Sequence, residues 1–377
     1  MRTYSPVPKS QESTQKMAKI KAALAGVGNC ASALIQGIQY YRKNPPKEDN
    51  LTTGLMHPSF GDYKVEDITF VAAFEVNRKK IGNDLSKAIF TEPNCAPKIS
   101  DVPDMGVTVK PGPILDGVAP HMKEPFNVYN RNRTKPVDVA AELKDSGAEI
   151  LINYLPVGSE KGARYYAQQA LDAGCGFVNC IPEFIASNDG WAKKFEERKL
   201  PIAGDDIKSQ VGATIVHRAL VDLFLKRGVR VDESYQLNLG GDTDFLNMTV
   251  EERLHSKRIS KTTAVASLIP YDVPTRIGPS DYVPSLNNKK ICYIYLKGRK
   301  WGNIPLQIDL KLSVEDSPNS AGVVADVVRA VKIGLDRGVG GALTSISSYC
   351  FKYPPVKIPD SQASQWVEEY IQGKRER

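Results

Sequence analysis

The fold of this chain is decided by the stretch Ile20-Lys21-Ala22-Ala23-Leu24-Ala25-Gly26-Val27-Gly28-Asn29-Cys30-Ala31. A short apolar run, typical of a strand, leads into Gly-x-Gly-x-x-Ala and then into a helical stretch that ends near Tyr41. This is the order in which the dinucleotide-binding fingerprint occurs. Gly26 permits a tight turn, Gly28 lets the backbone approach a pyrophosphate, and Ala31 keeps helix and strand close. The pattern predicts a dinucleotide site; the alternative is a strand-to-helix turn that binds nothing.

An acidic residue ends the next expected strand, which covers 68–74 and is followed by Glu75. A carboxylate at this place bonds the ribose hydroxyls of NAD and repels the extra phosphate of NADP. It comes later than the usual ~20 residues after the glycines, because a polar insertion over 43–67 separates the two motifs. We therefore expect Glu75 to bind NAD, with Asn77 as a helper or substitute. A solvated strand end is the alternative.

Strands and helices alternate through the middle of the chain, after a proline-rich excursion over 91–135. Helices are expected near 137–145, 160–173 and 189–198, and strands near 149–153, 176–180 and 201–204. Strand ends followed by small or polar residues, such as Pro156, line the cofactor crevice of a parallel sheet. The alternation predicts an α/β fold with a Rossmann-like doubly wound sheet.

A second candidate anion cradle follows the strand near 201–204 and opens a helix that runs to about 226. Its sequence is Asp205-Asp206-Ile207-Lys208-Ser209-Gln210-Val211-Gly212-Ala213-Thr214. Backbone N–H groups and hydroxyls at a helix N-terminus bind phosphate. An ordinary N-cap with acidic residues in the first turn is the alternative.

The stretch Gly240-Gly241-Asp242-Thr243-Asp244-Phe245-Leu246-Asn247-Met248 precedes a helix that carries Lys257 and Lys261. Lysines four residues apart share one helix face, and this proximity lowers the pKa of one of them toward neutrality. Asp242 and Asp244 offer oxygen ligands to a divalent or monovalent cation. A polar turn and a solvated helix are the alternative.

The regular alternation of strands and helices ends in the last third of the chain. Strands are expected near 235–239, 290–296 and 306–314, a four-proline loop over 270–287, and helices near 323–337 and 361–372. The last two strands alternate apolar with polar residues, as in an antiparallel sheet with one solvated face. The expected folded region ends at 345–355, before the last helix.

Composition limits the possible partners. The 377 residues are enough for about two domains, and the net charge of +7 is modest. No basic run with interleaved aromatic residues is present, so a small anionic substrate is favoured over nucleic acid.

No membrane span or signal peptide is expected, and residues 1–17 are expected to form a polar leader. The six cysteines form no Cys-x-x-Cys pair, which indicates reduced thiols in the cytoplasm.

Taken together, these motifs resemble the myo-inositol-1-phosphate synthase family in its short archaeal and bacterial form, over roughly residues 18–355. The matching pieces are Gly-x-Gly-Asn, Gly-Asp-Asp-Ile-Lys-Ser, Gly-Gly-x-x-Asp-Phe-Leu-Asn-Met, Ser-Lys-x-x-Ser-Lys and Asp-Ser-Pro-Asn-Ser-Ala-Gly, in the family's order. The resemblance implies conversion of D-glucose 6-phosphate to 1D-myo-inositol 3-phosphate, the first step of inositol biosynthesis. NAD oxidises carbon 5, the enolate formed at carbon 6 attacks the aldehyde, and NADH returns the hydride.

The resemblance also implies site residues, domains and an assembly. Those implied for catalysis are Lys257, Lys261, Lys297, Lys352, Asp206 and Lys208, with Arg299 or Lys300 as alternatives to Lys297. Those expected at the cofactor are Gly26, Gly28, Asn29, Cys30, Ala31, Glu75, Asn77, Pro156 and Asp205. Ser209, Gln210, Val211 and Gly212 are expected at the substrate phosphate, where family members of the long form read Gly-Gln-Thr after the serine. The domains are an NAD-binding unit over 18–232, an inserted α+β catalytic and tetramerisation unit over 233–316, and a returning segment over 317–377.

Two other functions fit the same fold. One is an NAD-dependent dehydrogenase of a sugar phosphate or polyol, which would accumulate NADH. The other is a non-catalytic NAD-binding oligomer. The lysine set argues against the second, because clustering like charges without a reaction is costly.

Overall fold

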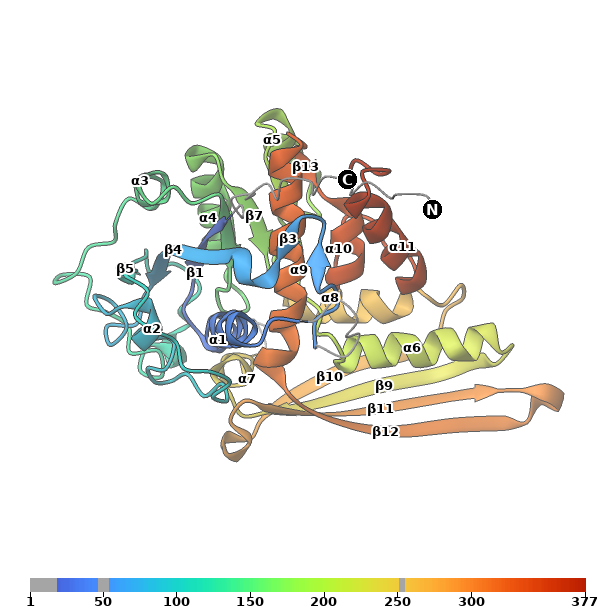
Figure 1. Ribbon diagram of the computed structural model, residues 1–377. Helices are drawn as coiled ribbons and strands as arrows, with labels where there is room; N and C mark the ends of the chain where they lie inside the picture. The colour runs from blue at the N-terminus through green and yellow to red at the C-terminus, as the bar shows by residue number, and fades with distance from the viewer. Residues whose placement is uncertain (1–18, 47–53, 251–254) are drawn as a thin grey trace, which may run out of the picture.

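Two β-sheets organise the computed structural model, which describes residues 19–46, 54–250 and 255–377, without the side chains of 255–258 and 279 (Figure 1). The expected leader over 1–17 lies outside the described residues. None of the helices in the described parts of the chain has the length and apolar character that a bilayer span requires.

Seven parallel strands form the first sheet, in the order β13-β8-β7-β6-β1-β4-β5. They are β1 Ile20–Ala25, β4 Ile68–Glu75, β5 Lys110–Pro111, β6 Ile150–Asn153, β7 Gly176–Asn179, β8 Pro201–Ala203 and β13 Gly341–Ala342. The chain builds outward from β1 to β5 on one side and from β6 to β13 on the other. The order therefore reverses between β1 and β6, where ligands bind in such sheets. The Rossmann-like doubly wound sheet is confirmed.

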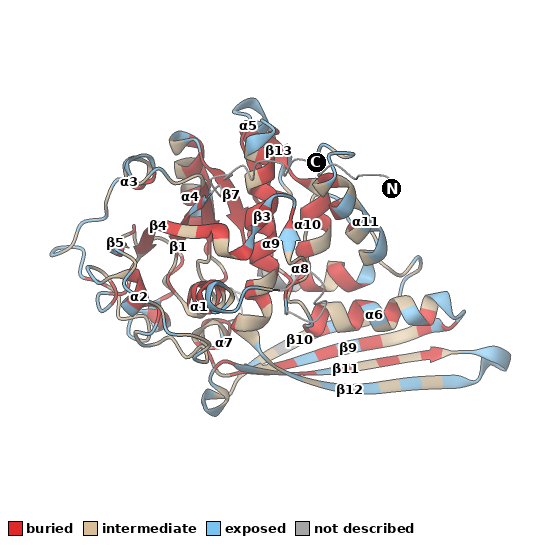
Figure 2. Ribbon diagram, in the orientation of Figure 1, coloured by how far each residue is buried: buried red, intermediate tan, exposed pale blue. Residues whose placement is uncertain are grey.

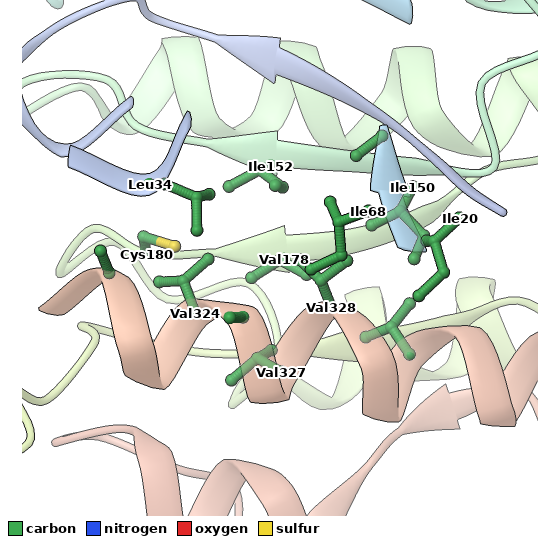
Figure 3. Packing of buried hydrophobic residues seen from close by; sticks show 14 of the residues in the cluster. Ile20, Leu34, Ile68, Ile150, Ile152, Val178, Cys180, Val324, Val327 and Val328 are labelled. Atoms are coloured by element: carbon green, nitrogen blue, oxygen red, sulfur yellow. The ribbon is translucent and has the colours of Figure 1, made fainter. Parts of the chain in front are cut away.

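Helices cover both faces of this sheet. On one face lie α1 Asn29–Lys43, α9 Asp316–Asp336 and α10 Thr344–Cys350, and on the other α3 Val139–Asp145, α4 Glu160–Ala173 and α5 Asp189–Glu197. Figure 3 shows Val324, Val327 and Val328 of α9 packed against the strands. Each fully buried side chain of this kind contributes about 1.5–3 kcal/mol.

Helix α9 begins at Asp316, earlier than the expected start near 323. Pro318 lies in its first turn, where backbone N–H groups have no partner within the helix, so a proline is tolerated. The predicted helix start near 323 is therefore wrong.

The second sheet holds four strands in the order β10-β9-β11-β12. They are β9 Arg230–Gly240, β10 Thr275–Tyr282, β11 Lys289–Arg299 and β12 Pro305–Glu315. Strands β9, β11 and β12 pair antiparallel, whereas β10 pairs parallel with β9. The expected loop over 270–287 is wrong, because β10 is an edge strand with a register shift between Ile277 and Ser280, and edges tolerate proline. The division of the chain at 233 and 316 stays a prediction.

The two faces of the second sheet differ. Helices α6 Ala213–Lys226 and α8 His255–Ala266 lie along one face and bury Val231, Ile277 and Leu296. On the other face Tyr235, Leu237 and Tyr293 remain 37–40% exposed. Figure 2 shows exposed and intermediate residues alternating with buried ones along these strands.

The C-terminal part returns to the first sheet through β13 and α10, which the sequence reading missed, and ends in α11 Asp360–Ile371. The remaining short elements are β2 Ser59–Phe60, β3 Tyr63–Lys64, η1 Val65–Asp67, α2 Leu85–Ala88, η2 Pro120–Met122, α7 Thr243–Asn247, η4 Pro284–Leu286 and η5 Trp301–Asn303.

A buried ion pair within α9 binds the hairpin β2–β3 and the residues that precede it. Asp326 and Arg329 are both 0% exposed and bond each other. Arg329 also donates to the carbonyls of His57, Pro58 and Tyr63, and His57 bonds Asp326 through Nδ1. Every buried charge in this cluster therefore has a partner, which is what makes its burial tolerable.

Candidate active site

A cavity of about 270 Å³ lies at the carboxyl ends of the first sheet, where the strand order reverses. The second sheet, α7 and α8 close its other side. Of the residues expected from the sequence, it is lined by Gly26, Gly28, Asn29, Cys30, Glu75, Asn77, Pro156, Asp206, Ser209, Gly212, Asp242, Asp244, Lys261 and Lys352. One cavity thus brings together the two anion cradles and two of the expected lysines.

The turn after β1 has the geometry of a pyrophosphate cradle. Gly26 has φ of 97°, and a Cβ there would lie 2.7 Å from the carbonyl oxygen of Tyr154. A Cβ on Gly28 would meet nothing within 4 Å, so open space adjoins the backbone at the start of α1. Gly28 caps that helix without a side-chain bond, which leaves first-turn N–H groups to an anion. Ala31 is buried behind the turn.

Asn29 and Cys30 have different surroundings. The Asn29 side chain accepts from the backbone N–H groups of Cys95 and Ala96. These bonds hold the proline-rich segment 91–135 against the glycine turn. Burial, together with the carboxylates of Asp316 and Asp242, raises the pKa of the Cys30 thiol to about 12. Cys30 is therefore an uncharged wall of the cavity.

Glu75 bonds the glycine turn directly. Its Oε2 accepts from the N–H of Val27 at 2.9 Å, and its Oε1 accepts from Val76 and Asn77. The nearby Lys80 ammonium, which the sequence reading overlooked, donates to the carbonyl of Val27 at 2.8 Å. Glu75 thus joins the end of β4 to the glycine turn, and its Oε2, which accepts one bond here, retains capacity to accept a ribose hydroxyl.

The second cradle is only partly directed at the cavity. Ser209 and Gly212 line it, as does Thr214 in the first turn of α6. The backbone N–H groups of Gln210 and Val211 bond to Asn319 instead. The side chains of Gln210 and Val211, both expected at the substrate phosphate, do not line the cavity.

Asp205 is turned into the protein. Its carboxylate accepts bonds from Asn179, Ile185, Ala186 and Ser187, and burial raises its pKa to about 6. It shapes the end of β8 and is not among the lining residues. A direct contact between Asp205 and a cofactor gains no support from this geometry.

Asp206 holds Lys352. The Lys352 ammonium donates to Asp206 Oδ1 at 2.7 Å, and Ser260 donates to Oδ2 at 2.6 Å. Asp206 has φ of 62°, in the left-handed region, and its backbone also bonds Ile181 and Lys352. Two residues implied for catalysis, Asp206 and Lys352, thus contact each other, and the aspartate fixes the position of the lysine ammonium.

Lys208 faces away from the cavity. It donates to the carbonyls of Ser348 and Tyr349 and to Asp360 Oδ1 at 3.0 Å. Burial lowers its pKa, and Asp360 opposes that effect. Lys208 therefore joins the segment after β8 to α10 and to the start of α11.

Lys261 lies on α8, 8% exposed, and lines the cavity. Lys257 occupies the same helix, but its side chain lies outside the described residues. The geometry of the expected lysine pair therefore stays a prediction.

Lys297 does not reach the cavity. It forms an ion pair with Glu233 at 3.3 Å, and Arg299 bonds Asp232. Lys290, at the other end of β11, lines the cavity and bonds Asp316 Oδ1 at 3.2 Å. Burial acts to lower the pKa of Lys290, but Asp316 and Asp244 outweigh it and raise that pKa.

The sequence reading missed Lys290 because strand register was needed to find it. Lys290 pairs with Gly240, so the register places this lysine beside the glycine pair. Gln236 and Asn238 of β9 and Ser320 of α9 also line the cavity and were not expected. Gln236 and Asn238 were not predicted, because polar residues that alternate with apolar ones along a strand usually face solvent.

Asp242 caps α7, because its Oδ1 accepts from the N–H groups of Asp244 and Phe245. Among the described residues, no group of three His, Cys, Asp or Glu side chains is placed to hold a metal ion. The cation at Asp242 and Asp244 stays a prediction.

The chain is similar to known inositol-phosphate enzymes. Residues 212–317 match a family model described as myo-inositol-1-phosphate synthase. The inositol-3-phosphate synthase of Corynebacterium glutamicum is 51% identical over 360 residues, 93% of this chain and 98% of that protein. That of Mycobacterium tuberculosis H37Rv is 48% identical over 376 residues, 99% and 100% of the two chains. The crystal structure of inositol-3-phosphate synthase from Caenorhabditis elegans, 15% identical, has a TM-score of 0.75 and covers 94% of this chain and 86% of that one, which is a likeness of fold.

Proposed function

The chain belongs to the inositol-3-phosphate synthase family and is an isomerase, and we propose that it converts D-glucose 6-phosphate in the cavity described above, with NAD regenerated in each turnover. The observation that carries this proposal is the placement of Lys261, Lys290 and Lys352 around one cavity that also contains the glycine turn. Lysines at one cavity can supply the proton exchange and the positive charge that the isomerisation needs.

The residues present fit NAD. The glycine turn has open backbone space at Gly28, and the Glu75 carboxylate stands at the end of β4. The hydroxyl of Tyr154 is buried at the cavity without a hydrogen-bond partner among the described residues, as expected for a group that a ligand satisfies. Bound NAD would supply the acceptor and later the donor of one hydride.

The residues of the chain have three tasks in this reaction. A base must take the proton of the carbon 5 hydroxyl, a base must take a proton from carbon 6, and positive charge must stabilise the oxygens where negative charge develops. Lys352, held by Asp206, and Lys261 would exchange these protons. Lys290, whose raised pKa keeps it charged, supplies fixed positive charge. Ser209, Gly212 and Thr214 would hold the phosphate at the start of α6.

The proposal is tested by incubating the purified chain with glucose 6-phosphate and a trace of NAD. Phosphorus NMR follows the phosphate signal while absorbance follows NADH. We expect an inositol phosphate in molar excess over NAD, with no lasting NADH. Lasting NADH without cyclisation would identify a sugar-phosphate dehydrogenase, and no reaction with any of several added cations would favour the non-catalytic oligomer.

Replacing Glu75 with alanine is expected to weaken NAD binding about tenfold or more and to reduce discrimination against NADP. The change removes both the ribose acceptor and the bond to the Val27 N–H, and about 1.4 kcal/mol corresponds to tenfold. Calorimetric titration with each dinucleotide measures the effect. Replacing the exposed Glu92 is the control, and unchanged NAD affinity in Glu75→Ala would contradict the assignment.

The outer face of the second sheet supports the expected homotetramer. Leu237 and Tyr293 pair across β9 and β11, and the ring of Tyr235 stacks on that of Tyr295 at 4.8 Å. Apolar side chains gathered on an uncovered sheet face are typical of an interface between copies.

Replacing Leu237 with aspartate is therefore expected to dissociate the assembly, because a charge would be buried between the copies. Sedimentation velocity at a fixed protein concentration measures the state. Leu223→Asp on α6, at a residue 51% exposed, is the control and should leave the assembly unchanged. An assembly that survives Leu237→Asp would place the interface elsewhere.

We likewise propose that the protein is located in the cytoplasm.

A further inference from the structure

A buried lysine lies beside the glycine turn and forms no ion pair with any of the described residues. Lys80, in the turn that follows β4, is 3% exposed and lines the cavity. Its ammonium donates to the carbonyl oxygen of Val27 at 2.8 Å and to Asn94 Oδ1 at 2.7 Å, and both acceptors are neutral. Burial lowers the pKa of Lys80, and the charge of Glu75 opposes that effect. Burying a cation without an ion pair is costly, so a function that uses the charge is expected.

The carbonyl that Lys80 bonds already has a neutral donor. Asn94 donates from Nδ2 to the carbonyl of Val27 at 3.1 Å and to that of Ile89 at 2.9 Å. The orientation of this carboxamide is fixed, because its oxygen faces an ammonium that only donates and its nitrogen faces carbonyls that only accept. Lys80 therefore adds a positive charge to a carbonyl whose position a neutral hydrogen bond already restrains.

The Val27 carbonyl belongs to the same peptide as the Gly28 N–H. In a planar trans peptide the C=O and N–H bonds point in opposite directions, so a carbonyl held toward Lys80 turns the N–H the other way. The Gly28 N–H has no acceptor among the described residues, and open space adjoins this glycine. A cation at the carbonyl oxygen also polarises the peptide, which makes its N–H a stronger donor. The peptide is thus prepared to bond an anion at the start of α1.

We propose that Lys80 is a positioning residue for the dinucleotide, which holds the Val27–Gly28 peptide with its N–H toward the pyrophosphate and adds a buried positive charge behind it. This inference rests on the proposed binding of NAD at the glycine turn. Glu75 and Lys80 then serve different parts of one ligand, the carboxylate the ribose hydroxyls and the ammonium the pyrophosphate. Bound pyrophosphate supplies the negative charge that the buried ammonium lacks.

The test measures the affinity of the purified chain for NAD and ADP by calorimetric titration, and for adenosine by competition with ADP. Lys80→Met keeps the aliphatic stem but removes the charge. We expect this variant to bind ADP and NAD about 10- to 100-fold more weakly, the loss of one charge-assisted hydrogen bond. Adenosine has no pyrophosphate, so its affinity should stay within about twofold. At saturating NAD, kcat should stay near the wild-type value, because a lost binding contact raises KM alone.

The matched control is Lys79→Met, which removes the same charge from the neighbouring residue. The Lys79 side chain is 49% exposed and its Nζ lies 3.8 Å from Glu92 Oε2, so all three affinities should be unchanged. Lys80→Gln removes the charge but keeps a polar side chain, and it takes the place of Lys80→Met if that variant does not fold. Lys80→Arg keeps the charge and should recover most of the ADP affinity.

Two results would overturn the inference. One is wild-type ADP affinity in the variants that remove the charge. The other is an equal loss of adenosine and ADP affinity together with a fall in melting temperature, which marks a lysine that only supports the fold. The proposed function is checked separately with the unmodified chain. If wild type bound neither ADP nor NAD, the proposed cofactor site would fail, whatever the Lys80 variants did.

Discussion

Replacing Lys290 with alanine is expected to lower kcat for glucose 6-phosphate about 100- to 1,000-fold, the loss typical of removing one preorganised electrostatic group. Lys290 lines the cavity, and its ammonium is held by Asp316 at 3.2 Å, so its charge is in place before the substrate arrives. The raised pKa of Lys290 keeps that charge throughout the neutral range. Steady-state assays of inositol phosphate formation measure the effect.

The matched control is Lys297→Ala on the same strand. Lys297 is 43% exposed in its side chain and pairs with Glu233, an exposed ion pair of the kind worth about 0–1 kcal/mol. That variant should retain wild-type kcat and NAD affinity. The opposite pattern, with Lys297→Ala inactive and Lys290→Ala active, would restore Lys297 as the catalytic cation and reject the assignment drawn from the strand register.

The first sheet was predictable because its signals are local. Apolar runs alternate with helical stretches, and the glycine turn between β1 and α1 can be recognised from about a dozen consecutive residues. Strands β1, β4 and β6 accordingly lie within one residue of their expected bounds. Strand β13 was missed because two residues carry no periodicity.

The site was less predictable because it depends on register and side-chain direction. Lys290 and Lys297 lie on one strand, and only the pairing of Lys290 with Gly240 separates the cavity lysine from the peripheral one. Asp206 and Lys208 are two residues apart, yet the first faces the cavity and the second bonds Asp360 behind it. A motif names the residues that come together, but it does not say which side of a backbone each one occupies.

Replacing Asp326 with alanine is expected to lower the free energy of unfolding by about 3–5 kcal/mol, the cost of leaving a buried charge without its partner. Arg329 would remain 0% exposed with only carbonyl oxygens to accept its protons. Urea denaturation at one fixed protein concentration measures the change, because the proposed assembly would make stability depend on concentration. Glu160→Ala, which breaks an exposed pair with Arg164, is the control and should cost less than about 1 kcal/mol.

The same variant should change the pH dependence of stability through His57. Burial acts to lower the pKa of His57, but its bonds to Asp326 and Glu368 outweigh that effect and raise it. A raised folded-state pKa contributes stability that is fully present below the unfolded value near 6.5 and is lost as pH rises through the folded value. The difference between wild type and Asp326→Ala should therefore be largest below about pH 6.5 and shrink at higher pH. A constant difference across that range would mean that Arg329 alone, and not His57, depends on Asp326.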